Sequence, residues 1–154
     1  MMSWQTFPHE ADVGVRGCGA TLAEAFAGAA TALTSVVCAP AEVVARESVA
    51  ITCRAPDREL LLVDWLNALI YEMATRHLLF SRFEVAIAGG EQGSEQGSEQ
   101  GIGRELTLKA TVFGEAIDVA RHQPAAEAKG ASFCELRVAR ADDGSWCAQC
   151  VVDV

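Results

Sequence analysis

The chain has 154 residues, enough for one domain with one hydrophobic core. Hydrophobic residues make up 51% and charged residues 21%, which excludes an intrinsically disordered chain. Twelve basic residues against twenty-one acidic ones give a net charge of −9, which disfavours nonspecific binding to nucleic acid or anionic lipid, although a local basic patch could exist within an acidic whole. We therefore expect RNA, if it is involved, to be reached indirectly through a partner protein.

The amino-terminal stretch HEADVGV, residues 9–15, places an imidazole and two carboxylates beside the start of a strand. Residues 1–8 before it lack the basic and apolar regions of a signal peptide. The longest apolar stretch in a helical segment, residues 60–63, is interrupted by Asp64 and is far too short to cross a membrane. We expect a soluble, cytoplasmic protein without membrane binding.

Two helices follow from apolar spacing. The first begins at Thr21, which with Glu24 forms a capping box, and it ends before Pro40. The second begins after Asp57 and carries a broad apolar face that includes Trp65, which indicates a helix packed flat on a sheet.

The other segments alternate between apolar and polar residues, as strands do. Such runs lie at residues 49–53, 83–87, 106–112, 136–138 and 146–154, and the last two are joined by the turn signal Asp142-Asp143-Gly144. The order predicts an α+β fold, with two helices packed on a largely antiparallel sheet in a single two-layer domain over residues 1–154. Residues 89–103 repeat EQGS and predict a flexible hairpin insertion.

The six cysteines are interpreted as free thiols, because the expected compartment is reducing. Cys147 and Cys150 have C-x-x-C spacing within an alternating strand. Their thiols should therefore point to opposite faces, and no second pair completes a zinc site.

Two aspartates lie near opposite ends of the chain. Asp12 begins a strand and Asp153 interrupts the last one, where an exposed or edge-protecting charge would be ordinary. If the first and last strands are neighbours, Asp12, Asp153 and the carboxylate of Val154 would form a hard oxygen site suited to Ca²⁺ or Mg²⁺ rather than zinc.

A polar segment at residues 114–130 is the third candidate. It holds Glu115, Asp118, Arg121, His122 and Lys129, which are either solvated loop residues or a displayed functional group. Lys129 precedes a strand and could hold an anion or phosphate near a metal.

Several motifs in order resemble the archease family. HEADVGVRGCGATLAEAF is similar to its opening H-x-A-D-x-G and T-L-x-E-A-F helix, and ELLLVDWLNALIYEM to its L-L-x-x-W-L-N-x-L-x-Y helix. LLFSRFEV resembles its F-x-x-F-x-V strand, and GEAIDVARH its G-E-x-x-D-x-x-x-H loop. Lys129 stands at its following lysine, and WCAQCVVDV resembles its closing strand with a penultimate aspartate.

The resemblance implies an accessory protein for the GTP-dependent RNA ligase that joins ends bearing a 3′-phosphate or 2′,3′-cyclic phosphate, as in tRNA splicing and RNA repair. Such a protein is not itself an enzyme. It promotes guanylylation of the ligase's active-site histidine and allows multiple turnovers. By the same resemblance Asp12, Asp153 and Val154 would hold a divalent cation, calcium in relatives, with Mg²⁺ or Mn²⁺ as alternatives, and Lys129 would be the functional lysine.

The chain departs from the family after the lysine. The family's tyrosine and histidine are Phe133 and Cys134 here, and its glycine-threonine pair before the lysine is Ala125-Ala126. The role of that histidine is therefore not carried over. His9 matches the family opening, but packing or capping explains it as well as a role behind a metal ligand.

Two other classes of function remain open. A metal-dependent hydrolase would use Asp12, Glu115 and His122, although neither H-E-x-x-H nor G-x-S-x-G occurs. A general chaperone or interaction module would use the acidic surface and need no metal. The oligomeric state and the RNA substrates do not follow from the sequence.

Overall fold

A computed structural model describes residues 2–89 and 105–154. The elements follow one another along the chain as β1 (Ser3–His9), β2 (Asp12–Gly19), α1 (Leu22–Val37), the 3₁₀ helix η1 (Pro40–Glu42), β3 (Glu47–Ala55), α2 (Arg58–Arg76), β4 (Leu78–Ala88), β5 (Leu106–Ala116), α4 (Val119–His122), β6 (Gly130–Ala131), β7 (Arg137–Arg140) and β8 (Trp146–Asp153). Apart from residue 89, the predicted EQGS insertion lies outside the described residues.

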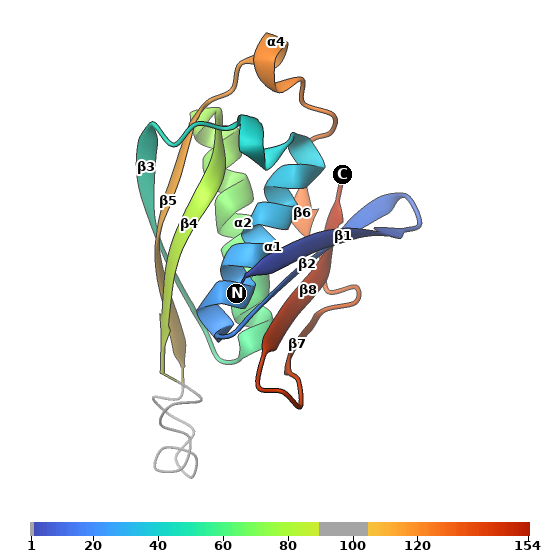
Figure 1. The fold of residues 1–154 in the computed structure, drawn as a ribbon, viewed down its shortest axis with the longest axis vertical. Coiled ribbons are helices and arrows are strands. Elements are labelled where there is room, and N and C mark those ends of the chain that lie inside the picture. The colour runs from blue at the N-terminus through green and yellow to red at the C-terminus, as the bar shows by residue number, and fades with distance from the viewer. Residues whose placement is uncertain (1, 90–104) are drawn as a thin grey trace.

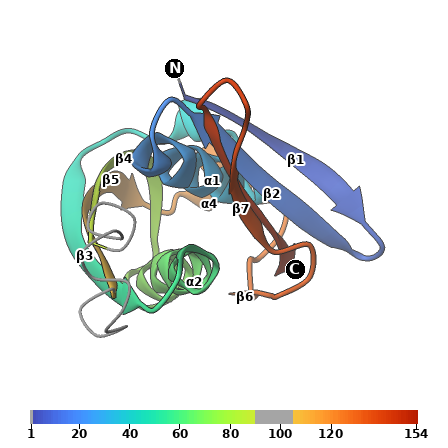
Figure 2. The same ribbon diagram turned by 90° about the horizontal axis from the view of Figure 1, so that it is seen from below.

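The strands form two antiparallel sheets with the two long helices between them (Figures 1 and 2). Sheet A has the order β1-β2-β8-β6, and β7 also pairs with β8. Sheet B has the order β3-β5-β4. The two expected helices are present as α1 and α2 and the pairing is antiparallel, but the structure adds a short third helix, α4. The structure differs from the expected single sheet in a two-layer domain because both helices contact strands of both sheets.

Helix α1 packs so closely on sheet A that only glycine fits at the contact. Thr21 Oγ1 accepts a hydrogen bond from Glu24 N at 3.1 Å, which confirms the predicted cap. A Cβ added at Gly17 of β2 would lie 2.0 Å from Ala29 N. The backbones of β2 and α1 are therefore in direct contact, and this contact fixes the strand that begins at Asp12.

Helix α2 is capped as predicted and is tied to α1. Asp57 Oδ1 accepts from Leu60 N at 2.8 Å, and the helix ends at His77 in the left-handed conformation. Trp65 is fully buried, and its Nε1 donates to Phe26 O on α1 at 3.0 Å. The interpretation of Trp65 as a core residue is confirmed.

The prediction of six free thiols was wrong for two of them. Cys18 of β2 and Cys147 of β8 are directly opposite in the sheet, with a Cα–Cα distance of 4.1 Å, and they form a disulfide. The other four cysteines are free, and Cys150 is buried on the opposite face from Cys147, as the alternation predicted. The prediction rested on the expected reducing compartment, whereas the bond follows from the inter-strand register, which places Cys18 opposite Cys147.

Candidate functional site

The two ends of the chain meet at one end of sheet A. In the pairing of β2 with β8, Val13 lies opposite Val152, so Asp12 and Asp153 occupy the next positions along these strands. Val154 N donates a hydrogen bond to Asp12 Oδ1 at 3.2 Å. Asp12, at the start of the second strand, is therefore in contact with the last residue, although they are separated by 142 positions.

Lys129 lies beside Asp153, on the opposite side of β8 from Asp12. Its backbone N–H donates to Asp153 O at 2.8 Å, and Gly130 pairs with Asp153 in the register of β6. Asn67 of α2 holds this segment, because its Oδ1 accepts from Ala131 N at 2.9 Å. Asn67 was not among the residues singled out from the sequence, and the signal that could have identified it is an amide beside the apolar face of α2.

Strand alternation places both aspartates on the face of sheet A that points away from the helices, here called the outer face. Val15 and Gly17 of β2 lie against the helix layer, so Asp12 and Arg16 point outward. On β8, Val152 is fully buried and Asp153 is exposed. The register therefore puts the two carboxylates in adjacent outward positions, and His9 of β1 lies opposite Asp12 in the same row.

The donors gathered here have the chemistry of a hard-cation site. They are carboxylate oxygens from two strands, together with the carboxylate of Val154, the type of ligand that Ca²⁺ and Mg²⁺ prefer. Within residues 2–89 and 105–154, no group of three or more His, Cys, Asp or Glu side chains is arranged to hold a metal. The two aspartates alone do not complete a coordination shell. The residues fit a divalent cation only when the Val154 carboxylate and further oxygens contribute.

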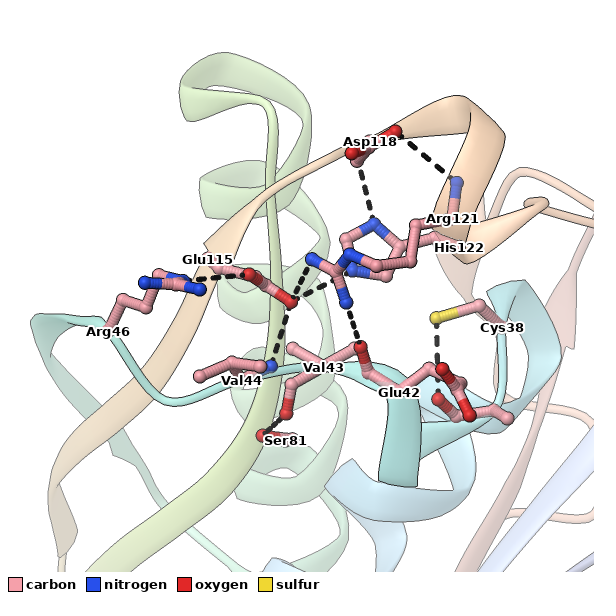
Figure 3. A network of polar contacts seen from close by, with 11 residues as sticks. Cys38, Glu42, Val43, Val44, Arg46, Ser81, Glu115, Asp118, Arg121 and His122 are labelled. Atoms are coloured by element: carbon pink, nitrogen blue, oxygen red, sulfur yellow. Dashed lines mark hydrogen bonds and ion pairs between the residues drawn. The ribbon is translucent and has the colours of Figure 1, made fainter.

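The other polar residues of the 114–130 segment form a closed network around Glu115, which Figure 3 shows from close by. This carboxylate is only 4% exposed. It accepts hydrogen bonds from Arg121 Nη2 at 2.6 Å, Val44 N at 2.8 Å, His122 Nε2 at 3.0 Å and Arg46 Nε at 3.2 Å. The hydrogen bond from Arg121 and that from the Val44 backbone, followed by those from His122 and Arg46, lower the pKa of Glu115 to about 2.

His122 has one orientation and one tautomer in this network. Asp118 N donates to His122 Nδ1 at 2.9 Å, so the ring proton lies on Nε2 and is donated to Glu115. Asp118 Oδ1 caps α4 by accepting from Arg121 N at 3.2 Å. Each of these side chains has a hydrogen-bond partner within the network. We therefore interpret Glu115, Asp118, Arg121 and His122 as residues that hold the loop in place, and not as an open site.

The structure therefore separates the sequence candidates into two groups. Asp12, Asp153, Val154 and Lys129 come together at the end of sheet A. Glu115 and His122 contact each other at the end of β5, and Asp12 is not grouped with them in the part of the chain that the structure describes. Phe133 and Cys134, which replace the aromatic and imidazole of the motif, are exposed beyond β6.

Comparison with known proteins identifies what the chain resembles. The model of the Archease protein family matches residues 4–154. The protein archease of Pyrococcus abyssi is 32% identical and that of Thermococcus gammatolerans is 33% identical, each over the full length of both chains. The solution structure of protein 1598 from Methanobacterium thermoautotrophicum has a TM-score of 0.79 and 28% identity, covering 99% of each chain.

No helix among the described residues is long and apolar enough to cross a lipid bilayer.

Proposed function

This chain belongs to the archease family, and we propose that it is an accessory protein that activates a GTP-dependent RNA ligase. The ligase joins RNA ends that carry a 3′-phosphate or a 2′,3′-cyclic phosphate, in tRNA splicing and RNA repair. In this proposal the ligase carries out all covalent chemistry. The accessory protein promotes guanylylation of the ligase histidine and permits repeated turnover, and it acts in the cytoplasm.

The observation that supports the proposal is the convergence of Asp12, Asp153, Val154 and Lys129. These residues come from the start of β2, the end of β8 and the segment before β6, and they meet at one end of sheet A. The packing that brings them together involves most of the chain. An exposed set of carboxylates beside a lysine is an arrangement that can be presented to the nucleotide pocket of a partner.

In this proposal Asp12, Asp153 and the Val154 carboxylate hold a divalent cation, calcium in the first instance and Mg²⁺ or Mn²⁺ as alternatives. The cation, when bound, supplies positive charge that can offset the charge of a reacting phosphate. Asp12 is half-buried and accepts a hydrogen bond from Val154 N, so its carboxylate is held in one place. The exposed Lys129 ammonium orients a phosphate of the bound guanosine nucleotide.

The test is ligation of a 3′-phosphate RNA with limiting cognate ligase, GTP and Mn²⁺. Wild-type protein is expected to raise the product above one per ligase molecule. Asp12→Asn, Asp153→Asn and Lys129→Gln should lose this stimulation while still binding the ligase. Asp142→Asn, which removes an exposed carboxylate from the β7–β8 turn, is the matched control and should stimulate fully. Full stimulation by Asp12→Asn and Asp153→Asn would contradict the cation site.

Two further measurements separate the proposal from its alternatives. The protein alone should be inert towards generic phosphoester substrates, since a hydrolase would turn them over without the ligase. Suppression of aggregation of unrelated proteins that persists with a chelator would instead favour a general chaperone.

The contribution of the Val154 carboxylate has its own test. Adding one glycine after Val154 moves the carboxylate out of the proposed set and should weaken Ca²⁺ binding measured by calorimetry.

A further inference from the structure

Arg16 of β2 and Arg137 of β7 point to the outer face of sheet A, away from the carboxylates, whereas Arg140 lies opposite Trp146 in the row that faces the helices. Arg16, Arg137 and Arg140 line a hollow of about 300 Å³ whose other walls include Gln149 and Cys147. We call this hollow the arginine pocket. It contains no Asp or Glu side chain, although the chain as a whole has a net charge of −9.

The register of three neighbouring strands builds the arginine pocket. Arg16 of β2 lies opposite Gln149 of β8, and Arg137 of β7 lies opposite the same Gln149. The Cys18–Cys147 disulfide is two residues further along β2 and β8, next to this row. Arg140 is at the end of β7, opposite Trp146.

The side chains around Arg16 hold its guanidinium in place. Arg16 Nε donates to Gln149 Oε1 at 2.8 Å, and its guanidinium carbon lies 4.8 Å from the centroid of the Phe7 ring. Gln149 is fixed in turn, because its Nε2 donates to Glu135 O at 3.0 Å. Arg140 lies 5.8 Å from the Trp146 ring centroid. Because the bond from Arg16 uses Nε, the two Nη groups remain available to a ligand.

The pocket arginines lack counterions among the described residues, unlike four other arginines of the chain. Arg46, Arg76, Arg82 and Arg121 each form an ion pair with a glutamate. Arg16, Arg137 and Arg140 form none with any carboxylate of residues 2–89 and 105–154. Arg16 and Arg137, which share one face and one neighbour without a counterion, create a local positive potential that an anion can neutralise.

We propose that the arginine pocket binds a phosphate group of an RNA strand. The planar guanidinium presents paired N–H groups that match phosphate oxygens, and several of them around one hollow favour an oxyanion over an apolar ligand. At physiological ionic strength, salt screens charge–charge interactions beyond about 8 Å. A phosphate in the pocket therefore responds to the nearby arginines more than to the distant carboxylates that make the net charge negative.

The pocket is on the same face as Asp12 and Asp153. Arg16 is four residues from Asp12 along β2, which corresponds to about 13 Å at the usual strand rise. We therefore place the carboxylates within reach of a strand that is bound at the arginine pocket. That this strand is the substrate of the ligase rests on the proposed function, whereas the binding itself does not.

The experiment measures binding of a fluorescein-labelled single-stranded RNA to the protein alone, by anisotropy at about 0.15 M ionic strength and without ligase. Arg137→Gln is expected to weaken binding about tenfold, and Arg137→Lys, which keeps the charge, should weaken it less. The log–log slope of affinity against salt concentration should fall by about 0.7 for each phosphate that a variant no longer neutralises. Arg54→Gln, which removes an exposed arginine from β3 of sheet B, is the matched control and should bind like the wild type.

Thermal unfolding of each variant shows that the fold is retained, and the absence of ligase keeps this test separate from that of the activation. Unmeasurable RNA binding by the folded wild type, or equal weakening by Arg54→Gln, would overturn the proposal. Equally tight binding of GTP, abolished in the same variants, would assign the pocket to a free nucleotide and overturn it too. Loss of ligase binding in Arg137→Gln with unchanged RNA binding would assign the pocket to carboxylates of a protein partner instead.

Discussion

Substitution of Gly17 by alanine tests whether the backbones of β2 and α1 are in contact. The added Cβ would lie 2.0 Å from Ala29 N and 2.3 Å from Ala25 O, both backbone atoms of α1. Real Cβ contacts are essentially never below 3.0 Å, so the helix and the strand would have to separate by about 1 Å. A backbone cannot rotate away as a side chain can, so the cost should be at the upper end of the range for overpacking, about 3 kcal/mol.

The assay is thermal unfolding of Gly17→Ala beside Gly130→Ala. A loss of about 3 kcal/mol in a domain of this size lowers Tm by about 6–12 °C. At Gly130 the nearest atom to an added Cβ is Asn67 Oδ1 at 3.7 Å, an ordinary contact, so this control should melt within about 2 °C of the wild type. Equal melting temperatures for the two variants would show that α1 does not lie directly on β2, and the reasoning about how Asp12 is positioned would fail.

Other predictions concern the Glu115 network, the thiols and a buried hydroxyl. The pKa of Glu115 is lowered from 4.5 to about 2, so the contribution of its carboxylate to the free energy of unfolding is fully present above pH 4.5 and is lost as the pH falls to about 2. Glu115→Gln should therefore flatten this part of the curve of stability against pH, measured by urea unfolding. A thiol reagent at neutral pH should modify only the exposed Cys134 in the native protein, because the other free cysteines are buried. Burial also raises the pKa of Cys53 to about 11 and that of Cys150 to about 12. After unfolding without reductant the reagent should find four thiols, and a count of six would contradict the disulfide. Thr34→Val removes the hydrogen bond from the buried Oγ1 to Phe80 O at 2.6 Å with little change of shape and should cost about 1–3 kcal/mol of unfolding free energy in urea; an unchanged value would show that this bond does not contribute.

Local features of the fold could be predicted from the sequence because their causes are local. The caps at Thr21 and Asp57 depend on a side chain and a backbone amide three residues away, and both were confirmed. The division into two sheets could not be predicted, because apolar alternation shows that a segment is a strand but not which strand it pairs with. The disulfide between Cys18 and Cys147 was missed for the same reason.

The candidate site was partly predictable from the residues, and the family resemblance added the meeting of the chain ends. The residues alone suggested that Asp12 and Asp153 would be a cation site if the chain ends met, and the contact between Asp12 and Val154 shows that they do meet. The separation of Glu115 and His122 from that site was not predictable, because whether a polar loop residue is satisfied depends on Val44 and Arg46, which are far away in the sequence. The arginine pocket needs the register of β2, β7 and β8 together.

The role of the cation site is tested most directly by the rate at which the ligase incorporates labelled GMP from GTP after a first ligation round. It would be measured with wild-type protein, with Asp12→Asn and with the control Asp142→Asn. We expect rapid guanylylation with the wild type and the control, and a return to the rate of the ligase alone with Asp12→Asn, although that variant still binds the ligase. Guanylylation with Asp12→Asn at the wild-type rate would contradict the claim that the meeting of the two chain ends activates the ligase.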